Sequence, residues 1–253
     1  MTPRILIVYE DNHVLGIVKP AGLLAQGDRT GDPTALAQAR EYVRERHAKP
    51  GNVYLGLVHR IDRPVSGVMV LARTSKAASR LSRSFHDRLV EKTYLAVVVG
   101  SVQKDSGELS GFVERTHTRS RMAGEGGANA RAASLAYRVL GRGELALPTR
   151  DRRGRTPVTS RATTLLEVTP RTGRHHQIRL QLSAAGFPIV GDLKYRAPEP
   201  LPDRAIALHA ARLRFPHPVG GEMLELSAAP PAVIPWTLFA NAIERCISPA
   251  APS

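Results

Sequence analysis

The alternation of apolar and polar positions predicts a chain in which short strands are interspersed with helices. Two apolar runs flank the polar turn at residues 10–12 and predict adjacent strands at 5–9 and 14–18. Asp32-Pro33 predicts a helix start, with Asp as N-cap and Pro in the first turn, and the helix is expected to reach about His47. Apolar runs predict further strands at 53–58, 67–72, 93–99 and 162–168.

Two more helices follow from apolar residues at helical spacing. One is capped by Thr74 or Ser75 and extends to about Arg88. The other carries Ile178 and Leu182 and ends at Gly186. Strands that alternate with helices, with hairpins mixed in, predict an α+β (mixed α/β) fold with a central mixed sheet flanked by helices and loops.

The chain contains no internal repeat and no Gly/Ser-rich linker, so we expect one domain over residues 1–247 and a disordered Pro/Ala-rich tail at 248–253. Residues 116–131 and 147–160 are basic and lack periodicity, which predicts loops. By composition alone, such loops are more often solvated surface than binding sites.

The charge of the chain indicates a polyanionic partner. Lys and Arg number 36 against 22 Asp and Glu, for a net charge of +14, and only six of the 36 are Lys. Arg binds phosphate through two nitrogens and stacks on bases, which suits nucleic acid. Codon usage in a GC-rich genome is an alternative explanation for the preference for Arg.

Cys246 is the single cysteine, which excludes an internal disulfide and a cysteine-rich zinc site. The pattern contains no P-loop, no dinucleotide-binding fingerprint and no H-E-x-x-H, so we expect neither a cofactor nor a metal. No apolar run is long enough for a signal peptide or a membrane span, so a cytoplasmic protein that does not bind membranes is expected.

Asp62 is the candidate catalytic carboxylate. It lies between Arg60 and Arg63, where a predicted strand gives way to a loop. Neighbouring arginines favour the ionised form of a carboxylate, and such a group can attack or stabilise an anomeric carbon. The alternative is an Asp that holds a turn through a backbone hydrogen bond, and the local sequence favours that structural role.

The segment Arg171–Arg179 places three Arg and two His at the start of a predicted helix. Backbone N–H groups and the helix dipole already favour phosphate at such a position. A charged helix face is the alternative, but the density of charge favours anion binding. The adjacent His175 and His176 are unsuited to sharing one metal ion from a helical face.

Five short blocks together resemble the family of RNA pseudouridine synthases that modify ribosomal and transfer RNA, in the branch typified by RluA. In chain order they are Lys19–Gly22 (K-P-x-G), His59–Asp62 with Ser66-Gly67 (H-R-L-D…S-G), Lys92–Ala96 (K-x-Y-x-A), Arg171–Arg179 with Gly191-Asp192 and Tyr195, and Leu208–Ala210 with Phe215 and His217-Pro218 (L-H-A…F-x-H-P). Each block alone is a weak to moderate signal, but five in the family's order make chance similarity very improbable.

The resemblance implies a role for each matched residue. Asp62 is similar to the essential aspartate, Arg60 to the arginine that enters the RNA helix in place of the flipped nucleotide, and Arg179 to the arginine that pairs with the aspartate. Tyr94 resembles the tyrosine that stacks on the target base, although its spacing alone favours a core aromatic residue. We expect further RNA contacts from His59, Arg63, Arg171, Arg174, His176 and Lys19.

The implied reaction is isomerisation of uridine to pseudouridine in structured RNA, by one catalytic domain with a largely antiparallel sheet. We expect this domain to act as a monomer. A flipped-out uridine would expose its glycosidic bond, and Asp62 would either attack C1′ or take a ribose proton. Ile61 departs from the family's usual Leu. The first block begins at Lys19, which leaves no room for the S4-type RNA-binding domain of many relatives. We therefore expect the catalytic domain to bind its RNA through the basic stretches 115–131, 150–155 and 171–174. The alternatives are a non-catalytic RNA-binding or assembly factor and a nucleic-acid glycosylase.

Overall fold

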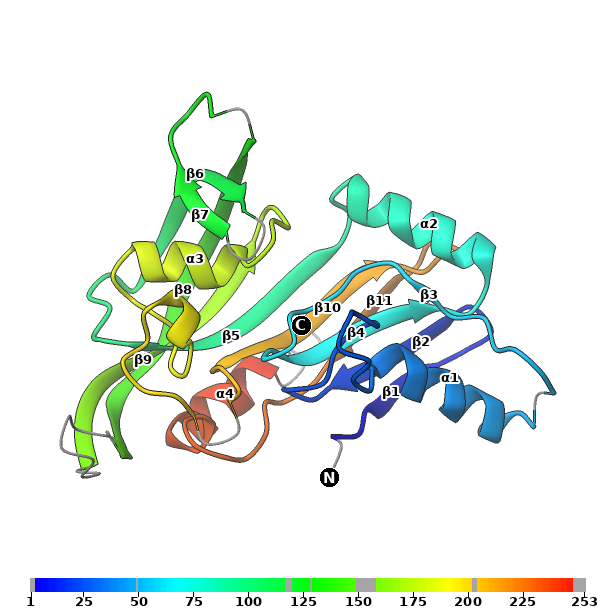
Figure 1. Cartoon of the computed structure of the whole chain (residues 1–253), viewed down its shortest axis with the longest axis horizontal. Helices are drawn as coiled ribbons and strands as arrows, with labels where there is room; N and C mark the ends of the chain where they lie inside the picture. Colours follow the sequence, from blue (N-terminus) through cyan, green and yellow to red (C-terminus); the bar gives the residue numbers. More distant parts are fainter. Residues whose placement is uncertain are drawn as a thin grey trace, which may run out of the picture. The chain divides into compact units, whose positions relative to one another are not determined.

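The computed structural model describes residues 3–48, 50–116, 120–127, 129–148, 158–201 and 204–247. The chain divides into two compact units (Figure 1). Unit 1 comprises Met1–Lys92 and His209–Pro230, and unit 2 comprises Thr93–Leu208 and Pro231–Ser253. The predicted tail at 248–253, and residues 149–157 of the second predicted basic loop, lie outside the described residues.

Unit 1 is built on a mixed sheet. Its strands are β1 (Leu6–Glu10), β2 (Val14–Lys19), β3 (Gly56–Leu57), β4 (Ser66–Ala72), β10 (Leu208–Pro216) and β11 (Met223–Ser227). β2 pairs antiparallel with β1 and with residues 67–72 of β4, whereas β10 pairs parallel with the start of β4. β3 pairs with the end of β4, and β11 with β10. Every residue of β4 is buried, as expected for a strand covered on both faces.

Two helices of twelve residues belong to unit 1, α1 (Ala35–Arg46) and α2 (Ser75–His86). The predicted Asp32 cap of α1 is wrong, because Thr34 is the N-cap and its hydroxyl accepts the N–H of Ala37 at 3.0 Å. The prediction for α2 is confirmed, with Thr74 as N-cap. Its apolar side packs on β4 in a core formed by Val14, Val68, Val70, Ala72, Ala77, Leu81, Val90, Leu213, Phe215 and Leu226.

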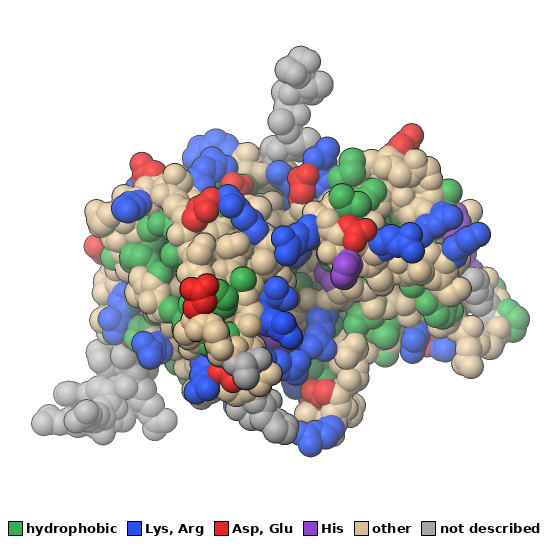
Figure 2. All heavy atoms as spheres, turned by 90° about the horizontal axis from the view of Figure 1, so that it is seen from above, with side chains coloured by type: hydrophobic (Ala, Val, Ile, Leu, Met, Phe, Trp, Pro, Cys, Tyr) green, Lys and Arg blue, Asp and Glu red, His purple; other side chains and the backbone are tan. Residues whose placement is uncertain are grey.

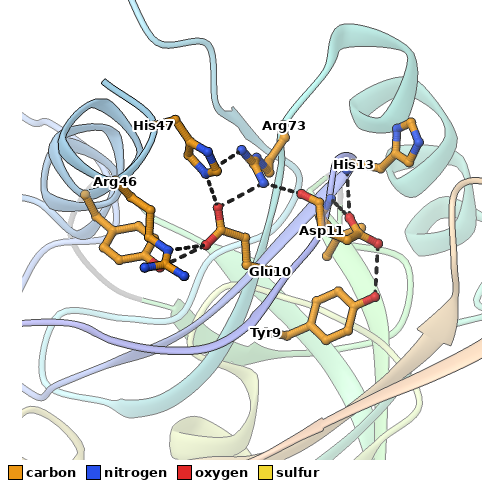
Figure 3. A network of polar contacts seen from close by, with 9 residues as sticks. Tyr9, Glu10, Asp11, His13, Arg46, His47 and Arg73 are labelled. Carbon is orange, nitrogen blue, oxygen red and sulfur yellow. Dashed lines mark hydrogen bonds and ion pairs between the residues drawn. The ribbon is translucent and has the colours of Figure 1, made fainter. Parts of the chain in front are cut away.

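A polar network holds the turn between β1 and β2 (Figure 3). The carboxylate of Asp11 accepts the N–H groups of His13 and Val14, each at 2.7 Å, which is how Asp stabilises a turn. Glu10 forms ion pairs with His47 at 2.6 Å and Arg73 at 2.9 Å. Burial alone would raise the pKa of Glu10, but these partners and the Tyr42 hydroxyl lower it. The turn thereby connects the end of α1 with the end of β4.

Unit 2 contains an antiparallel sheet and four short helical segments that follow its last strand in the chain. Its strands are β5 (Glu91–Val99), β6 (Ser106–Arg115), β7 (Ser120–Ala123), β8 (Ala130–Pro148) and β9 (Val158–Pro170), and its helices are α3 (Gln177–Ala184), η1 (Leu193–Tyr195), η2 (Trp236–Phe239) and α4 (Ala240–Ile247). The order is β5-β9-β8-β6-β7. α3 packs against β6 and β7 (Figure 1).

The predicted α+β class with a mixed sheet is confirmed, while several boundaries are wrong. The strand predicted at 53–58 is reduced to the two residues of β3. Part of the first predicted basic loop is strand, because β7 and the first residues of β8 lie within 116–131. These strands contain few apolar residues, so the alternation of apolar and polar positions that would predict a strand is weak. Within the described residues, no helix has the length and apolar character needed to cross a membrane.

Candidate active site

Asp62, the candidate catalytic carboxylate, lies in the segment between β3 and β4. Asp62 is half-buried, whereas Arg60 and Arg63 on either side are exposed. Ile61 is 6% exposed and anchors the segment in the interior of unit 1. The backbone carbonyl of Asp62 accepts the N–H of Val65 at 3.1 Å and closes a turn into β4. The sequence thus folds so that one acidic side chain is presented between two exposed arginines.

The buried side chain of Lys19 makes hydrogen bonds to the backbone of this segment and of residues 20–23. Its side chain is fully buried, and its ammonium group donates to the carbonyls of Pro20 at 2.9 Å, Leu23 at 2.8 Å and Arg63 at 3.2 Å. Desolvation lowers the pKa of Lys19 to about 7, and the charge of Asp62 acts in the opposite direction. These contacts support a positioning role, and the RNA contact expected of Lys19 stays a prediction.

A second connection joins the first two blocks. The N–H of Gly22 donates to the carbonyl of Arg63 at 2.8 Å, and Nε of Arg63 donates to the carbonyl of Gly22 at 3.0 Å. Gly22 has φ +82°, a conformation that favours glycine. The guanidinium of Arg63 also pairs with Asp32 at 2.8 Å. The K-P-x-G and H-R-I-D blocks are therefore one structural feature, although 40 or so residues separate them in the chain.

His59 fixes the other end of the segment. Its Nε2 accepts the N–H of Val70 at 2.9 Å, and its ring stacks on Phe85 of α2 with centroids 4.7 Å apart. Desolvation and the charge of Lys92 lower the pKa of His59 to about 3. The imidazole is therefore neutral at physiological pH, as acceptance of a backbone N–H requires. Its contacts are structural, and the predicted RNA contact is untested.

The S-G and L-H-A blocks also meet in unit 1. The hydroxyl of Ser66 lies 2.8 Å from Nδ1 of His209, whose Nε2 lies 3.0 Å from the carbonyl of Ala228. Because that carbonyl can only accept, Nε2 carries the proton and Nδ1 accepts from Ser66. Gly67 has φ +128°, and a Cβ there would lie 2.3 Å from the backbone oxygen of Ala210. Only glycine allows β4 and β10 to approach this closely.

Tyr94 and Arg179, the other two predicted catalytic residues, belong to unit 2. Tyr94 lies on β5 opposite Val168 of β9 and is half-buried, whereas the four residues that follow it on β5 are buried. Arg179 lies on α3 and is 4% exposed. Asp62 belongs to unit 1, so its predicted pairing with Arg179 stays a prediction.

Arg179 is held by two neighbours within unit 2. Its Nε and Nη2 donate to the two carboxylate oxygens of Asp192 at 2.7 and 2.8 Å. Its guanidinium also lies 5.0 Å from the ring centroid of Tyr195, a cation–π distance. Asp192 and Tyr195 are themselves 1% and 5% exposed. The planar guanidinium is therefore fixed in orientation by an acid and an aromatic ring.

The Tyr195 hydroxyl links this arginine to the β6–β7 region. It lies 2.8 Å from Nδ1 of His176 and 3.2 Å from the N–H of Ser120, which donates to it. The Ser120 hydroxyl in turn donates to the carbonyl of His175 at 2.7 Å. His175 and His176 stack with centroids 3.7 Å apart. Half-buried His176 therefore has an internal partner in addition to its predicted RNA contact.

The turn before α3 is shaped by Gln177 rather than by a side-chain cap. The Gln177 amide oxygen accepts from the Thr172 hydroxyl at 2.6 Å and from the N–H of Arg174 at 3.0 Å, and its amide nitrogen donates to Ser134 at 3.0 Å. Arg174 is exposed and donates to a β8 carbonyl, and exposed Arg171 pairs with Glu108. Both arginines are accessible to an anion from solvent.

Sequence reasoning missed the roles of Asp192, Tyr195, Gln177 and His209. All four lie inside the five sequence blocks, but a block identifies residues without showing what they contact. The sequence signal for these contacts was the presence of polar residues among apolar residues that are buried. Buried polar groups need hydrogen-bond partners, so such residues are expected to make internal contacts. Within the described residues, no three His, Cys, Asp or Glu side chains are grouped so that they could hold a metal ion.

Comparison with known proteins identifies similar chains. A family model described as RNA pseudouridylate synthase matches residues 13–184. The chain is 36% identical over 238 residues to ribosomal large subunit pseudouridine synthase D of Xanthomonas campestris pv. campestris, covering 89% of this chain and 66% of that protein. The chain thus spans slightly less than two thirds of that relative's length.

A second relative is matched over more of its length. The chain is 33% identical over 233 residues to tRNA pseudouridine synthase C of Salmonella typhimurium, covering 88% of this chain and 84% of that protein. Among solved structures, human RNA pseudouridylate synthase domain containing 1 superposes with a TM-score of 0.67 at 25% identity, over 93% of this chain and 88% of that chain.

Proposed function

Since the chain belongs to the RNA pseudouridine synthase family, we propose that it isomerises specific uridines to pseudouridine in structured ribosomal or transfer RNA, with Asp62 as the catalytic carboxylate. The observation that carries the proposal is the way in which the segment with Asp62 is held in place. The half-buried carboxylate lies on a segment held by hydrogen bonds to buried Lys19 and half-buried His59, with exposed arginines on both sides. Rigid support of this kind is what a reacting group needs.

The reaction rearranges the nucleoside without changing its composition. The N1–C1′ bond breaks, uracil rotates without leaving, and C5 bonds to C1′. C5 loses a proton and N1 gains one, so the mass of the RNA is unchanged. Asp62 acts at C1′ or on a ribose proton, and we propose Tyr94 as the ring that holds the base and Arg179 as the partner that keeps the carboxylate anionic.

RNA recognition in this proposal combines insertion and backbone contact. Arg60 is exposed beside Asp62 and would occupy the place of the flipped nucleotide, which offsets the lost stacking. Arg63, Arg171, Arg174 and His176 would contact RNA near the site. We propose that residues 1–247 act together as one catalytic domain, as a monomer in the cytoplasm. Ribosomal and transfer RNA are both proposed because the names of the matched relatives mention each.

The experiment is pseudouridine mapping on transcribed ribosomal and transfer RNA incubated with the purified protein. We expect pseudouridine at one or a few positions, and none with Asp62→Asn. Asp105→Asn is the matched control, because Asp105 is an exposed acid of unit 2 that pairs with Arg142, and it should retain full activity. Activity in Asp62→Asn would overturn the assignment of the carboxylate. Free uracil or an abasic site would indicate a glycosylase instead.

A further inference from the structure

The solvent side of α2 carries cations without acids. Lys76, Arg80 and Arg83 are exposed and are spaced four and three residues apart, so they lie on one side of the helix. The opposite side is apolar and packs on the core of unit 1. No Asp or Glu occurs anywhere in α2. We call these three residues the α2 basic face.

The charges of the α2 basic face are not neutralised within the described part of the chain. Neither Lys76 nor Arg83 has an ion pair there, and Arg80 donates to the carbonyl of Pro218 at 2.7 Å, which leaves its charge uncompensated. By contrast, Arg44 and Arg46 of α1 pair with Glu41 and Glu10. Like charges at this spacing repel one another and destabilise an isolated helix. An anionic partner would remove that repulsion.

The C-terminal end of the α2 basic face lies close to the segment that holds Asp62. Phe85, near the end of α2, stacks on His59. Lys76 lies nine residues before Phe85. At roughly 1.5 Å per residue, the far end of the basic face is therefore about 14 Å along the helix from the contact between Phe85 and His59. Exposed Arg60 lies on the same segment as His59. In the view from above, Lys and Arg side chains follow one another on the right-hand part of the surface, where α2 is topmost in Figure 1 (Figure 2).

The exposed serines of α2 suit the same partner. Ser75, Ser79 and Ser82 are each next to a cation of the α2 basic face in the sequence. Hydroxyl groups donate hydrogen bonds to phosphate oxygens, and Lys and Arg supply the charge. A nucleic-acid duplex carries one negative charge per about 1.7 Å of its axis, so several phosphates fit along a row of this length.

We propose that the α2 basic face binds the sugar–phosphate backbone of the RNA substrate beyond the target nucleotide, without reading its sequence. This rests on the proposed function, because the RNA must reach the Asp62 segment for its flanks to follow α2. The contact favours substrates with structured RNA on one side of the uridine over isolated short hairpins.

The test compares two triple variants with equal loss of charge. The test variant is Lys76→Gln/Arg80→Gln/Arg83→Gln, and the control is Arg29→Gln/Arg40→Gln/Arg44→Gln, which removes exposed arginines of unit 1 outside α2. Gln is a good helix former, so both should fold as the wild type does, as circular dichroism would verify. Binding is measured over a range of salt concentrations with a full-length tRNA transcript, a large-subunit rRNA fragment and short hairpins cut from each.

We expect the test variant to bind the long RNAs about tenfold more weakly and to lose roughly three units of the slope of log K against log salt, while the control changes much less. Affinity for the short hairpin with the modified uridine, and kcat on it, should be unchanged. Equal effects in the two variants, or equal weakening on short and long RNA, would overturn the proposal. Absence of pseudouridine with wild-type protein would defeat the proposed function alone, because the binding difference is measured independently of turnover.

Discussion

Arg179 and Asp192 form a two-point ion pair in which both side chains are buried, at 5% and 1% exposure. The pair joins α3 to the segment before η1, thirteen residues later. Two parallel hydrogen bonds fix the plane of the guanidinium as well as its position. The proposed role of Arg179 as partner of the catalytic carboxylate depends on such a fixed orientation.

Asp192→Asn should destabilise the protein by about 3 kcal/mol, because it removes the charge that compensates a buried guanidinium. Asp105→Asn is the matched control. It breaks a pair with Arg142 in which the acid is 84% exposed, and it should cost less than about 1 kcal/mol. Urea unfolding followed by circular dichroism measures both. Equal losses would mean that burial of the Arg179–Asp192 pair does not strengthen it.

Tyr195 allows its hydroxyl and its ring to be tested separately. Tyr195→Phe removes the contacts with His176 and Ser120 and should lower the free energy of unfolding by about 1–2 kcal/mol. Tyr195→Leu also removes the ring that faces Arg179, so we expect a further loss of stability and a lower kcat with little change in KM. If Phe and Leu variants behave alike in both assays, the ring does not position Arg179.

Gly67 should tolerate no side chain. A Cβ there would lie 2.3–2.7 Å from backbone atoms of Ala210, so Gly67→Ala should push β4 and β10 apart and cost several kcal/mol, roughly 4 or more. Gly31→Ala is the control, because Gly31 also has positive φ, +73°, but no neighbour within 4 Å of its would-be Cβ. It should cost only about 1–2 kcal/mol. Thermal unfolding would distinguish the two, and similar melting temperatures would contradict the steric explanation.

His59 should make the protein sensitive to acid. Its pKa is about 3 in the folded protein, against 6.5 for an unperturbed imidazole. Between these values the unfolded chain binds more protons than the folded chain, so the free energy of unfolding falls as pH falls, by at most about 1.4 kcal/mol per pH unit for this group. Protonation of Nε2 also removes the acceptor for Val70.

His59→Gln is the variant that isolates this effect, because its amide oxygen can accept the Val70 N–H without titrating. We expect a shallower loss of stability between pH 6.5 and pH 3, measured by urea unfolding in a pH series. Part of the dependence should remain, since burial also lowers the pKa of His209 to about 4. An unchanged slope would show that His59 does not contribute.

The periodic parts of the chain could be predicted because their pattern follows from local physics. β1, β2, β4, β5 and α2 all lie close to their predicted bounds, since apolar residues recur with the period of each element. β6, β7 and all of β8 were not predicted, because their exposed faces are polar and the two-residue period is weak. Residues that supply chemistry could be named from the blocks, but not their partners.

The sequence by itself determined the α+β class, the basic character of the chain and the candidates Asp62, Tyr94 and Arg179. Only the tertiary structure decided which separated residues meet: Lys19 with the backbone of Arg63, and Ser66 with His209, 143 residues away. Such pairings depend on strand order and on the close approach of backbones, as at Gly67. A local pattern carries the period of an element but not the identity of the element beside it.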